Sequence, residues 1–193
     1  MKKIISLFLS LIVFVSIISA NTTISEFKDA RGDSQTIVLL TKNNKASKIE
    51  IPCKTKGNTK GCIWIKPKDI SKFRDYLTIL RNKFQEWNDI AEKENVTDFT
   101  KDIPGKSPKV EFVWGLSTTF FADDCFKAKY ICQGSVKIVM CYAKVNASNN
   151  QFASEFFTIN FYDIKDIDNL LEALSEENIN EALTKVSQGN LFN

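Results

Sequence analysis

The chain of 193 residues contains no histidine. Serine–histidine–aspartate and cysteine–histidine catalytic sites both need an imidazole as base, so this chain acting alone cannot form either of them. Zinc sites that contain histidine are excluded for the same reason. Recognisable metal motifs and catalytic acid pairs are also missing. The sequence therefore predicts no catalytic residues, no metal site and no cofactor, and it leans against an enzyme.

Two groups of acidic residues have simpler explanations than chemistry. Adjacent residues of a strand point to opposite faces, so Asp123 and Asp124 cannot face each other across a sugar and instead indicate a turn. Asp163, Asp166 and Asp168 carry oxygens that calcium prefers, but their spacing is not that of an EF-hand. We interpret these three as residues that begin a helix.

Composition favours one globular domain at residues 21–193, since 44% of the residues are hydrophobic and 25% are charged. The net charge is +3, and it falls to +1 without Lys2 and Lys3. Nine lysines lie between Lys42 and Lys72, whereas seven acids lie between Asp163 and Glu181. The charge is therefore distributed unevenly along the chain, which is more informative than its sum.

Residues 1–20 have the pattern of a secretory signal peptide. Lys2 and Lys3 precede the apolar stretch Ile4–Ile18, and Ala20 offers a small residue at the cleavage point. A helix of that stretch would span about 22 Å, less than a hydrocarbon core of about 30 Å. We expect export to the periplasm or the medium, with no membrane span after cleavage.

Export bears on the cysteines, because an oxidising compartment permits disulfides. Cys53 and Cys62 flank the loop Lys54–Gly61, and we predict that they form a cross-strand disulfide that closes it. The alternative is that both are unpaired small apolar residues. Of the five cysteines, Cys125, Cys132 and Cys141 remain, and the sequence does not say how they pair.

The segment Lys68–Val96 has the clearest period in the chain. Its apolar residues recur at intervals of three and four, which predicts an amphipathic helix with this seam: Ile70, Phe73, Leu77, Leu80, Phe84, Trp87 and Ala91. Asp69 and Ser71 are candidate N-caps, and Asn95 suits a left-handed C-terminal position.

Strand patterns surround this helix. Thr36–Thr41 and Ser47–Ile51 flank an Asn43-Asn44 turn, and Ile49–Cys53 and Cys62–Lys66 flank the lysine-rich loop, which predicts two hairpins. Residues 110–161 alternate in hydrophobicity and predict an antiparallel meander of about four to five strands. Asn21–Gln35 is expected to be an exposed lead-in, and Thr97–Lys109 a loop.

Two short helices follow Asp163 at the C-terminal end. The whole pattern predicts an α+β fold in which an antiparallel sheet, made of N-terminal hairpins and a C-terminal meander, packs on one long amphipathic helix.

The lysine-rich loop and the strand after it carry the candidate binding residues. Lys54, Lys56 and Lys60 concentrate positive charge beside Trp64, which favours an anionic partner such as a glycan or a lipid head group. The loop has no aromatic residue to stack a base, so we expect no nucleic acid. The simpler interpretations are a solvated loop and a packed tryptophan.

The segment from Pro67 to the C-terminus resembles a family of small exported bacterial proteins of unknown function. The similarity lies in Phe73-Arg74-Asp75, Lys83-Phe84, Glu86-Trp87, Asn95-Val96 and Asp98–Lys101, in the Ala147–Asn150 turn and in the aromatic strand before Asp163. This resemblance implies an exported α+β protein and no particular activity, cofactor or site.

The sequence thus favours a secreted or periplasmic non-enzymatic protein that binds a macromolecule or an envelope component. Two alternatives stay open. One is an extracellular polymer hydrolase whose carboxylates are assembled only by the fold, from Glu111, Asp123, Asp124 or Glu155. The other is a structural module that assembles through an unpaired cysteine. Neither the ligand nor the oligomeric state follows from the sequence.

Overall fold

The computed structural model describes residues 19–43, 45–57 and 60–189, and within them it has ten strands, one long helix and two short C-terminal helices. All the strand pairs are antiparallel. The predicted α+β class with an antiparallel sheet is therefore confirmed.

The long helix α1 (Ile70–Lys93) follows a single 3₁₀ turn, η1 (Pro67–Asp69). Six of the seven predicted seam residues are buried, Ile70 is half-buried, and Tyr76 joins them. Asp69 occupies the N-cap position without a side-chain hydrogen bond, and Asn95 has the expected left-handed backbone with φ of 52°. The periodicity thus identified the helix and its buried face, while the predicted range Lys68–Val96 extends past the observed helix at both ends.

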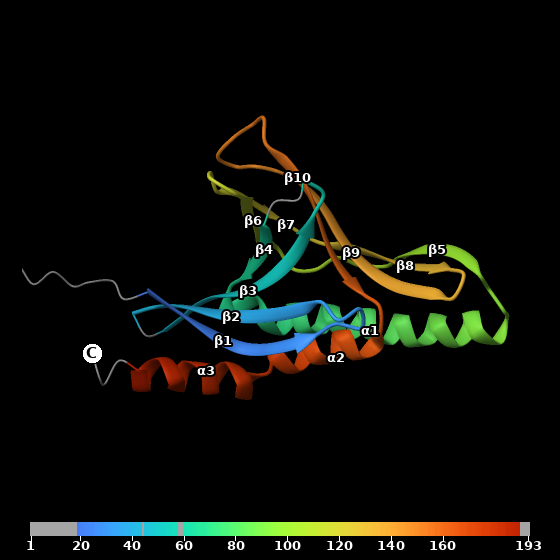
Figure 1. Cartoon of the computed structure of the whole chain (residues 1–193), viewed down its shortest axis with the longest axis horizontal. Coiled ribbons are helices and arrows are strands. Elements are labelled where there is room, and N and C mark those ends of the chain that lie inside the picture. Colours follow the sequence, from blue (N-terminus) through green and yellow to red (C-terminus); the bar gives the residue numbers. More distant parts are fainter. Residues whose placement is uncertain (1–18, 44, 58–59, 190–193) are drawn as a thin grey trace, which may run out of the picture.

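The sheet has two halves that share strand β3 (Figure 1). The first half runs in the order β1 (Ser19–Lys28), β2 (Ser34–Lys42), β3 (Lys45–Thr55), β4 (Lys60–Ile65), β6 (Val110–Gly115) and β7 (Phe120–Asp124). The second half runs in the order β5 (Asp98–Ile103), β8 (Lys127–Gln133), β9 (Val136–Asn146) and β10 (Ser154–Phe161), and β10 then pairs with the end of β3.

The two halves of the sheet contact each other where the β9–β10 turn reaches the β6–β7 hairpin, in the upper part of Figure 1. The backbone N–H of Ser148, in the β9–β10 turn, donates to the carbonyl of Phe121 at 2.7 Å, and Asn149 Nδ2 donates to the carbonyl of Thr119 at 2.9 Å. Aromatic residues fill the space between the halves, where the ring centroid of Phe112 lies 4.9 Å from those of Phe126 and Phe157.

The helices α2 (Ile164–Ala173) and α3 (Glu176–Gly189) lie beneath the β1–β2 hairpin in Figure 1. Helix α2 also packs on α1, and Arg81 Nε donates to Asp168 Oδ1 at 2.6 Å between them. Asp163 and Asp166 form a capping box at the start of α2. The interpretation of these acids as helix-starting residues is confirmed for both.

Three expectations about the strands need correction. Much of the expected lead-in at residues 21–35 forms β1, which pairs along its length with β2, and the expected loop at residues 97–109 contains the edge strand β5. The expected meander is divided, because β6–β7 extend the first half while β8–β9–β10 form the second. β5 pairs with β8, beyond two intervening strands, and a local pattern does not reveal such a partner. β1 pairs with the next strand, β2, and its mostly polar residues lack the apolar alternation that indicates a strand.

Residues 1–18, which make up most of the predicted signal peptide, and Asn44 of the predicted turn lie outside the described residues. In the part of the chain that is described, no helix is both long and apolar enough to cross a membrane.

Candidate functional site

Two hollows flank strand β3 at the point where it changes partner. The ladder between β2 and β3 ends at Val38–Glu50, and the ladder between β3 and β10 covers Lys54–Thr158 and Thr55–Phe157. Pro52 lies between the two ladders and has no N–H to donate, which favours a break in pairing at this point. Both hollows include Pro52, Cys53 and Lys54 in their walls.

The larger hollow, of about 930 Å³, is an open groove across β3, β4, β6 and β7, which we call the Trp64 groove. Its lining is Glu50, Pro52, Cys53, Lys54, Thr55, Gly61, Cys62, Trp64, Val113, Trp114, Gly115, Thr119 and Phe121. Ile63 and Ile65 alternate with Trp64 and are fully buried in the core, so Trp64 lies on the opposite, outer face of the sheet.

Trp64 is held in one orientation by its neighbours. Its Nε1 donates to Glu50 Oε2 at 2.7 Å, and Lys48 Nζ lies 4.0 Å above the ring centroid. The ring centroid of Phe121, in β7, lies 6.0 Å from that of Trp64. Trp64 therefore presents a half-buried aromatic surface whose polar edge is already hydrogen-bonded.

A row of acids crosses the outer face at the level of Trp64. Glu50 pairs with Trp64, Trp64 with Glu111, and Glu111 with Asp123 in successive ladders. Lys48 Nζ donates to Glu111 Oε2 at 2.7 Å. The fold thus brings together Glu111 and Asp123, two of the four acids considered for hydrolysis, although Glu111 already forms an ion pair with Lys48.

The other two acids lie elsewhere. Asp124 Oδ1 accepts the backbone N–H of Cys125 at 2.7 Å. Glu155 is buried in β10, where Oε1 accepts the backbone N–H groups of Lys56 at 3.1 Å and Gly57 at 3.2 Å. Glu155 therefore anchors the start of the lysine-rich loop to the second half of the sheet.

The candidate lysines have different surroundings. Lys54 Nζ donates to Asp33 Oδ2 at 2.9 Å; this hydrogen bond raises the pKa of Lys54 and lowers that of Asp33. Lys56 is exposed. The side chain of Lys60 lies outside the described residues, as do Asn58 and Thr59 of the same loop. Lys54 is therefore the one candidate lysine whose place in the Trp64 groove is defined.

The predicted Cys53–Cys62 disulfide is wrong. All five cysteines lie in the described part of the chain, and all are free thiols. Cys53 pairs with Gly61, and Cys62 pairs with Pro52. This offset of one residue puts the two side chains on opposite faces of the sheet. Burial, together with the nearby Glu50 carboxylate, raises the pKa of Cys62 to about 12.

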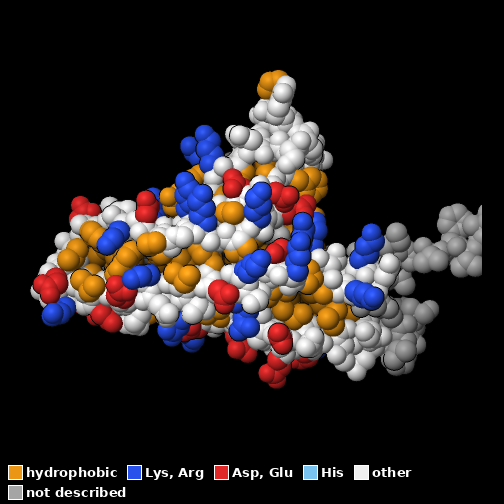
Figure 2. All heavy atoms as spheres, turned by 180° about the vertical axis from the view of Figure 1, so that it is seen from behind, with side chains coloured by type: hydrophobic (Ala, Val, Ile, Leu, Met, Phe, Trp, Pro, Cys, Tyr) orange, Lys and Arg blue, Asp and Glu red, His pale blue; other side chains and the backbone are white. Residues whose placement is uncertain are grey.

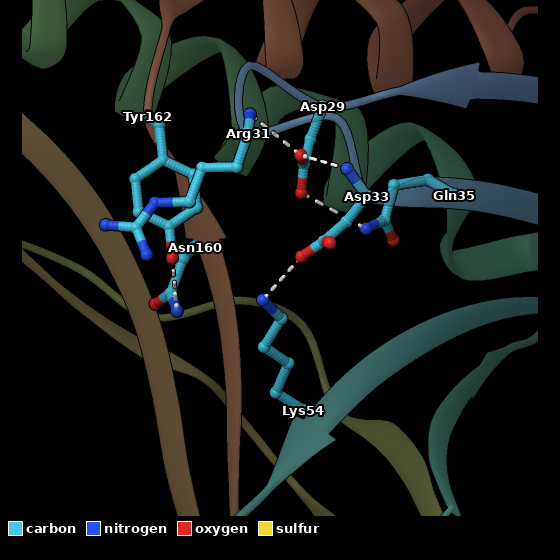
Figure 3. Close-up of polar contacts among 7 residues, drawn as sticks. All are labelled: Asp29, Arg31, Asp33, Gln35, Lys54, Asn160 and Tyr162. Carbon is cyan, nitrogen blue, oxygen red and sulfur yellow. Dashed lines mark hydrogen bonds and ion pairs between the residues drawn. The ribbon is translucent and has the colours of Figure 1, made fainter.

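The smaller hollow, of about 250 Å³, lies on the other side of β3, and we call it the inner cavity. Asp29, Asp33, Gln35, Lys54 and Asn160 are among the residues that line it, and Figure 3 shows them together with the neighbouring Arg31 and Tyr162. They come from the β1–β2 turn, from the start of β2, from β3, and from the end of β10 and the residue after it. None of them except Lys54 was singled out from the sequence, because the β1–β2 turn was interpreted as an exposed lead-in.

A third hollow lies at the far end of the molecule. Figure 2 shows apolar side chains gathered there, over the end of α1 and β5. The lining residues are Trp87, Ile90, Ala91, Val96, Phe99 and Lys101. Lys83 and Lys101 place their ammonium groups 5.7 Å and 5.0 Å from the Trp87 ring centroid, so cations already occupy its neighbourhood.

Part of the Trp64 groove was readable from the sequence. Ile49, Ile51, Ile63 and Ile65 alternate with Glu50 and Trp64, so strand parity alone indicates that these two side chains face away from the core. Parity does not indicate that Phe121 and Val113 join them, because this depends on β4 pairing with β6.

Comparison with family models, with curated proteins and with solved structures finds no match for this chain. The resemblance to exported bacterial proteins therefore stays a prediction.

Proposed function

We propose that the protein is a secreted or periplasmic, non-enzymatic binding protein that holds a segment of another macromolecule, or an envelope surface, in the Trp64 groove. The observation that carries this proposal is a wide, open hollow floored by aromatic and apolar side chains with charged groups at its side. Aromatic side chains that are already ordered supply binding area at a low entropic cost.

The contacts of Trp64 support this role. The hydrogen bond to Glu50 and the cation above the ring hold the indole before any partner arrives. Its exposed surface continues onto Phe121, so the two rings form one apolar area. A partner that covers both rings gains the free energy of apolar burial without having to order either one.

Positive charge at the side of the groove favours an anionic partner. Lys54 lines the groove, and its ion pair with Asp33 is exposed, so an incoming anion competes with Asp33 at small cost. Lys56 adds an exposed charge on the same strand end. Such exposed charges act mainly on the rate of association and are screened by salt.

Export is part of the proposal and is supported by the sequence. Lys2 and Lys3 followed by the apolar stretch Ile4–Ile18 have the arrangement of a signal peptide. The resemblance to exported proteins agrees with it.

Retention on a heparin matrix tests the role of the lysines. We expect the triple variant Lys54→Glu, Lys56→Glu, Lys60→Glu to elute at lower salt than the wild type. The matched control reverses three helix lysines, Lys72, Lys93 and Lys185, and so changes the net charge equally. Equal losses in both triples would mean that only net charge matters and would overturn the assignment to the groove.

The Trp64→Ala variant tests the aromatic floor. We expect it to weaken retention at every salt concentration while leaving the dependence on salt unchanged, since it removes apolar area and no charge. An unchanged elution position would exclude Trp64 from the binding surface.

A hydrolase is the second candidate, because Glu111 and Asp123 are cross-strand partners whose side chains lie next to each other on the outer face of the sheet. Polysaccharide hydrolysis by two carboxylates would release reducing ends from chitin, xylan or peptidoglycan, and Glu111→Gln would abolish it. The binding proposal predicts no release by the wild type. Release that depends on Glu111 would replace that proposal with the enzymatic one.

A further inference from the structure

Two neighbouring loops form the upper tip of the molecule in Figure 1. They are the β6–β7 loop, residues 116–119, and the β9–β10 turn, residues 147–153. The hydrogen bonds from Ser148 to Phe121 and from Asn149 to Thr119 hold the two loops side by side. We call the two loops together the loop tip.

The loop tip carries the two most exposed large apolar side chains among the described residues. Phe152 is 89% exposed and Leu116 is 80% exposed, whereas the next in order, Ile90, is 50% exposed. Neither Phe152 nor Leu116 belongs to the hydrophobic core. A single exposed apolar residue is ordinary, but two on adjoining loops form a candidate contact surface.

The sequence places no charge in the loop tip. Residues 112–122 and residues 145–154, which include both loops and the strand ends beside them, contain no lysine, arginine, aspartate or glutamate. The projection at the top of Figure 2 accordingly shows apolar and uncharged side chains on its visible face. Because a charge is costly to move out of water, a tip without charges can enter a less polar medium at a lower cost.

The backbone of the β9–β10 turn is hydrogen-bonded within the protein. The N–H of Ala147 donates to the carbonyl of Ala153 at 2.8 Å, and the N–H of Ala153 donates to the carbonyl of Asn150 at 3.0 Å. The N–H of Phe152 donates to Asn150 Oδ1 at 3.0 Å. Unpaired backbone groups are the main cost of placing irregular backbone in an apolar medium, and these bonds reduce that cost.

Two exposed lysines flank the base of the loop tip. Phe156 lies two residues beyond the β9–β10 pair nearest the turn, about 7 Å along the strand. Lys144 pairs with Phe156 on one side, and the N–H of Lys56 donates to the Phe156 carbonyl at 3.1 Å on the other side. Both lysines are exposed, whereas the neighbouring Glu155 is buried.

The acids of the outer face lie further from the loop tip. Glu111 pairs with Asp123 and precedes Gly115, the end of β6, by four residues or about 13 Å. The order from the tip is therefore apolar side chains, then lysines, then acids. The surface of a bilayer with anionic lipids presents the matching order of hydrocarbon, negative head groups and water.

We propose that the loop tip inserts into the surface of an anionic lipid bilayer, with Phe152 and Leu116 among the acyl chains and Lys56 and Lys144 at the head groups. Apolar burial and attraction to the head groups both favour this contact. The loop tip is a different surface from the Trp64 groove, and its contact with lipid does not depend on the function proposed for that groove.

Sedimentation with lipid vesicles tests the insertion. The full chain is mixed with vesicles of phosphatidylcholine alone, or of phosphatidylcholine and phosphatidylglycerol in equal amounts, and its partition coefficient is measured. We expect Phe152→Ser and Leu116→Ser each to lower the partition into mixed vesicles about tenfold, because each removes one large apolar side chain from the contact. Ile79→Ser removes a half-exposed side chain of α1 and should partition like the wild type.

Lys144→Gln tests the contact with the head groups. A lysine near an anionic surface strengthens binding about fivefold, so this variant should lose about that factor on mixed vesicles and nothing on phosphatidylcholine. Lys93→Gln, at the end of α1, makes the same change of net charge and should lose much less.

Phe152→Trp reports the depth of the loop tip directly. Lipids brominated in the acyl chain quench a tryptophan that they contact. The three native tryptophans lie in β4, β6 and α1, so we expect this variant to lose more fluorescence than the wild type. Circular dichroism checks that each variant is folded, and the quenching result holds even if a serine variant is not.

Four outcomes would overturn the proposal. Equal partition of Phe152→Ser and the wild type would mean that another part of the chain holds the vesicles, and a loss seen only with Trp64→Ala would place the contact in the groove. Equal quenching of Phe152→Trp and the wild type would exclude insertion. Self-association without lipid that Phe152→Ser abolishes would assign the loop tip to a second copy of this chain.

Discussion

Replacement of Asp166 by asparagine should destabilise the protein far more than the same replacement two residues later. The Asp166 carboxylate is 4% exposed and joins three parts of the chain: the β1–β2 turn through Ala30, the end of β10 through Tyr162 and the start of α2 through Asp163. An amide has one acceptor oxygen, so in either orientation its NH₂ group faces at least one backbone N–H donor.

The magnitude follows from the lost hydrogen bonds. Bonds to a charged acceptor contribute about 1.5–3 kcal/mol each, and the neutral amide recovers part of this because it is cheaper to bury. We expect Asp166→Asn to lower the free energy of unfolding by about 2–4 kcal/mol, which for a domain of this size corresponds to about 4–16 °C in the melting temperature. Urea unfolding followed by circular dichroism measures it.

Asp168→Asn is the matched control on the same helix. Asp168 pairs with Arg81, and their side chains are 43% and 39% exposed. An exposed ion pair contributes about 0–1 kcal/mol, so this variant should unfold almost like the wild type. Equal destabilisation by the two variants would refute the reasoning, since it would mean that burial of the Asp166 carboxylate adds nothing.

The remaining predictions concern the thiols and the glycine turns. Because the pKa of Cys62 is about 12, its thiolate is scarce at pH 8. We expect iodoacetamide to modify Cys62 roughly 10²-fold more slowly than it modifies glutathione, as measured by peptide mapping, and Glu50→Gln should speed the reaction. A rate like that of glutathione would contradict the burial of Cys62 beside Glu50. A raised thiol pKa stabilises the folded state at pH values below the unfolded pKa of about 8.5. The contribution of Cys62 to the free energy of unfolding should therefore be lost as the pH rises from there towards 12. Urea unfolding at several pH values would detect this loss. Gly115 has φ of 133°, and a Cβ there would lie 1.9 Å from the carbonyl oxygen of Thr118. At Gly134, φ is 61° and the space is open, so Gly134→Ala should lower the free energy of unfolding by roughly 1 kcal/mol, and Gly115→Ala by several times more. Similar losses in the two variants would count against the tight turn after β6.

Local patterns in the sequence determined the long helix, the two C-terminal helices and most of the strands, but not β1 and β5. The interval of three and four in Ile70–Ala91 is repeated in the buried face of α1, and the strand patterns at Ile49–Cys53 and Cys62–Lys66 are found again in β3 and β4. These predictions succeed because the period of a helix or strand is a property of a few consecutive residues.

The tertiary structure alone decided the sites. The register that separates Cys53 from Cys62, the opposition of Glu111 and Asp123, and the change of partner that opens the inner cavity beside β3 all depend on which strands pair and with what offset. A shift of one residue exchanges the two faces of a strand while leaving its local pattern unchanged. Pairing between strands sets that shift. For this reason the sequence revealed most of the strands but not the groove and the cavity between them.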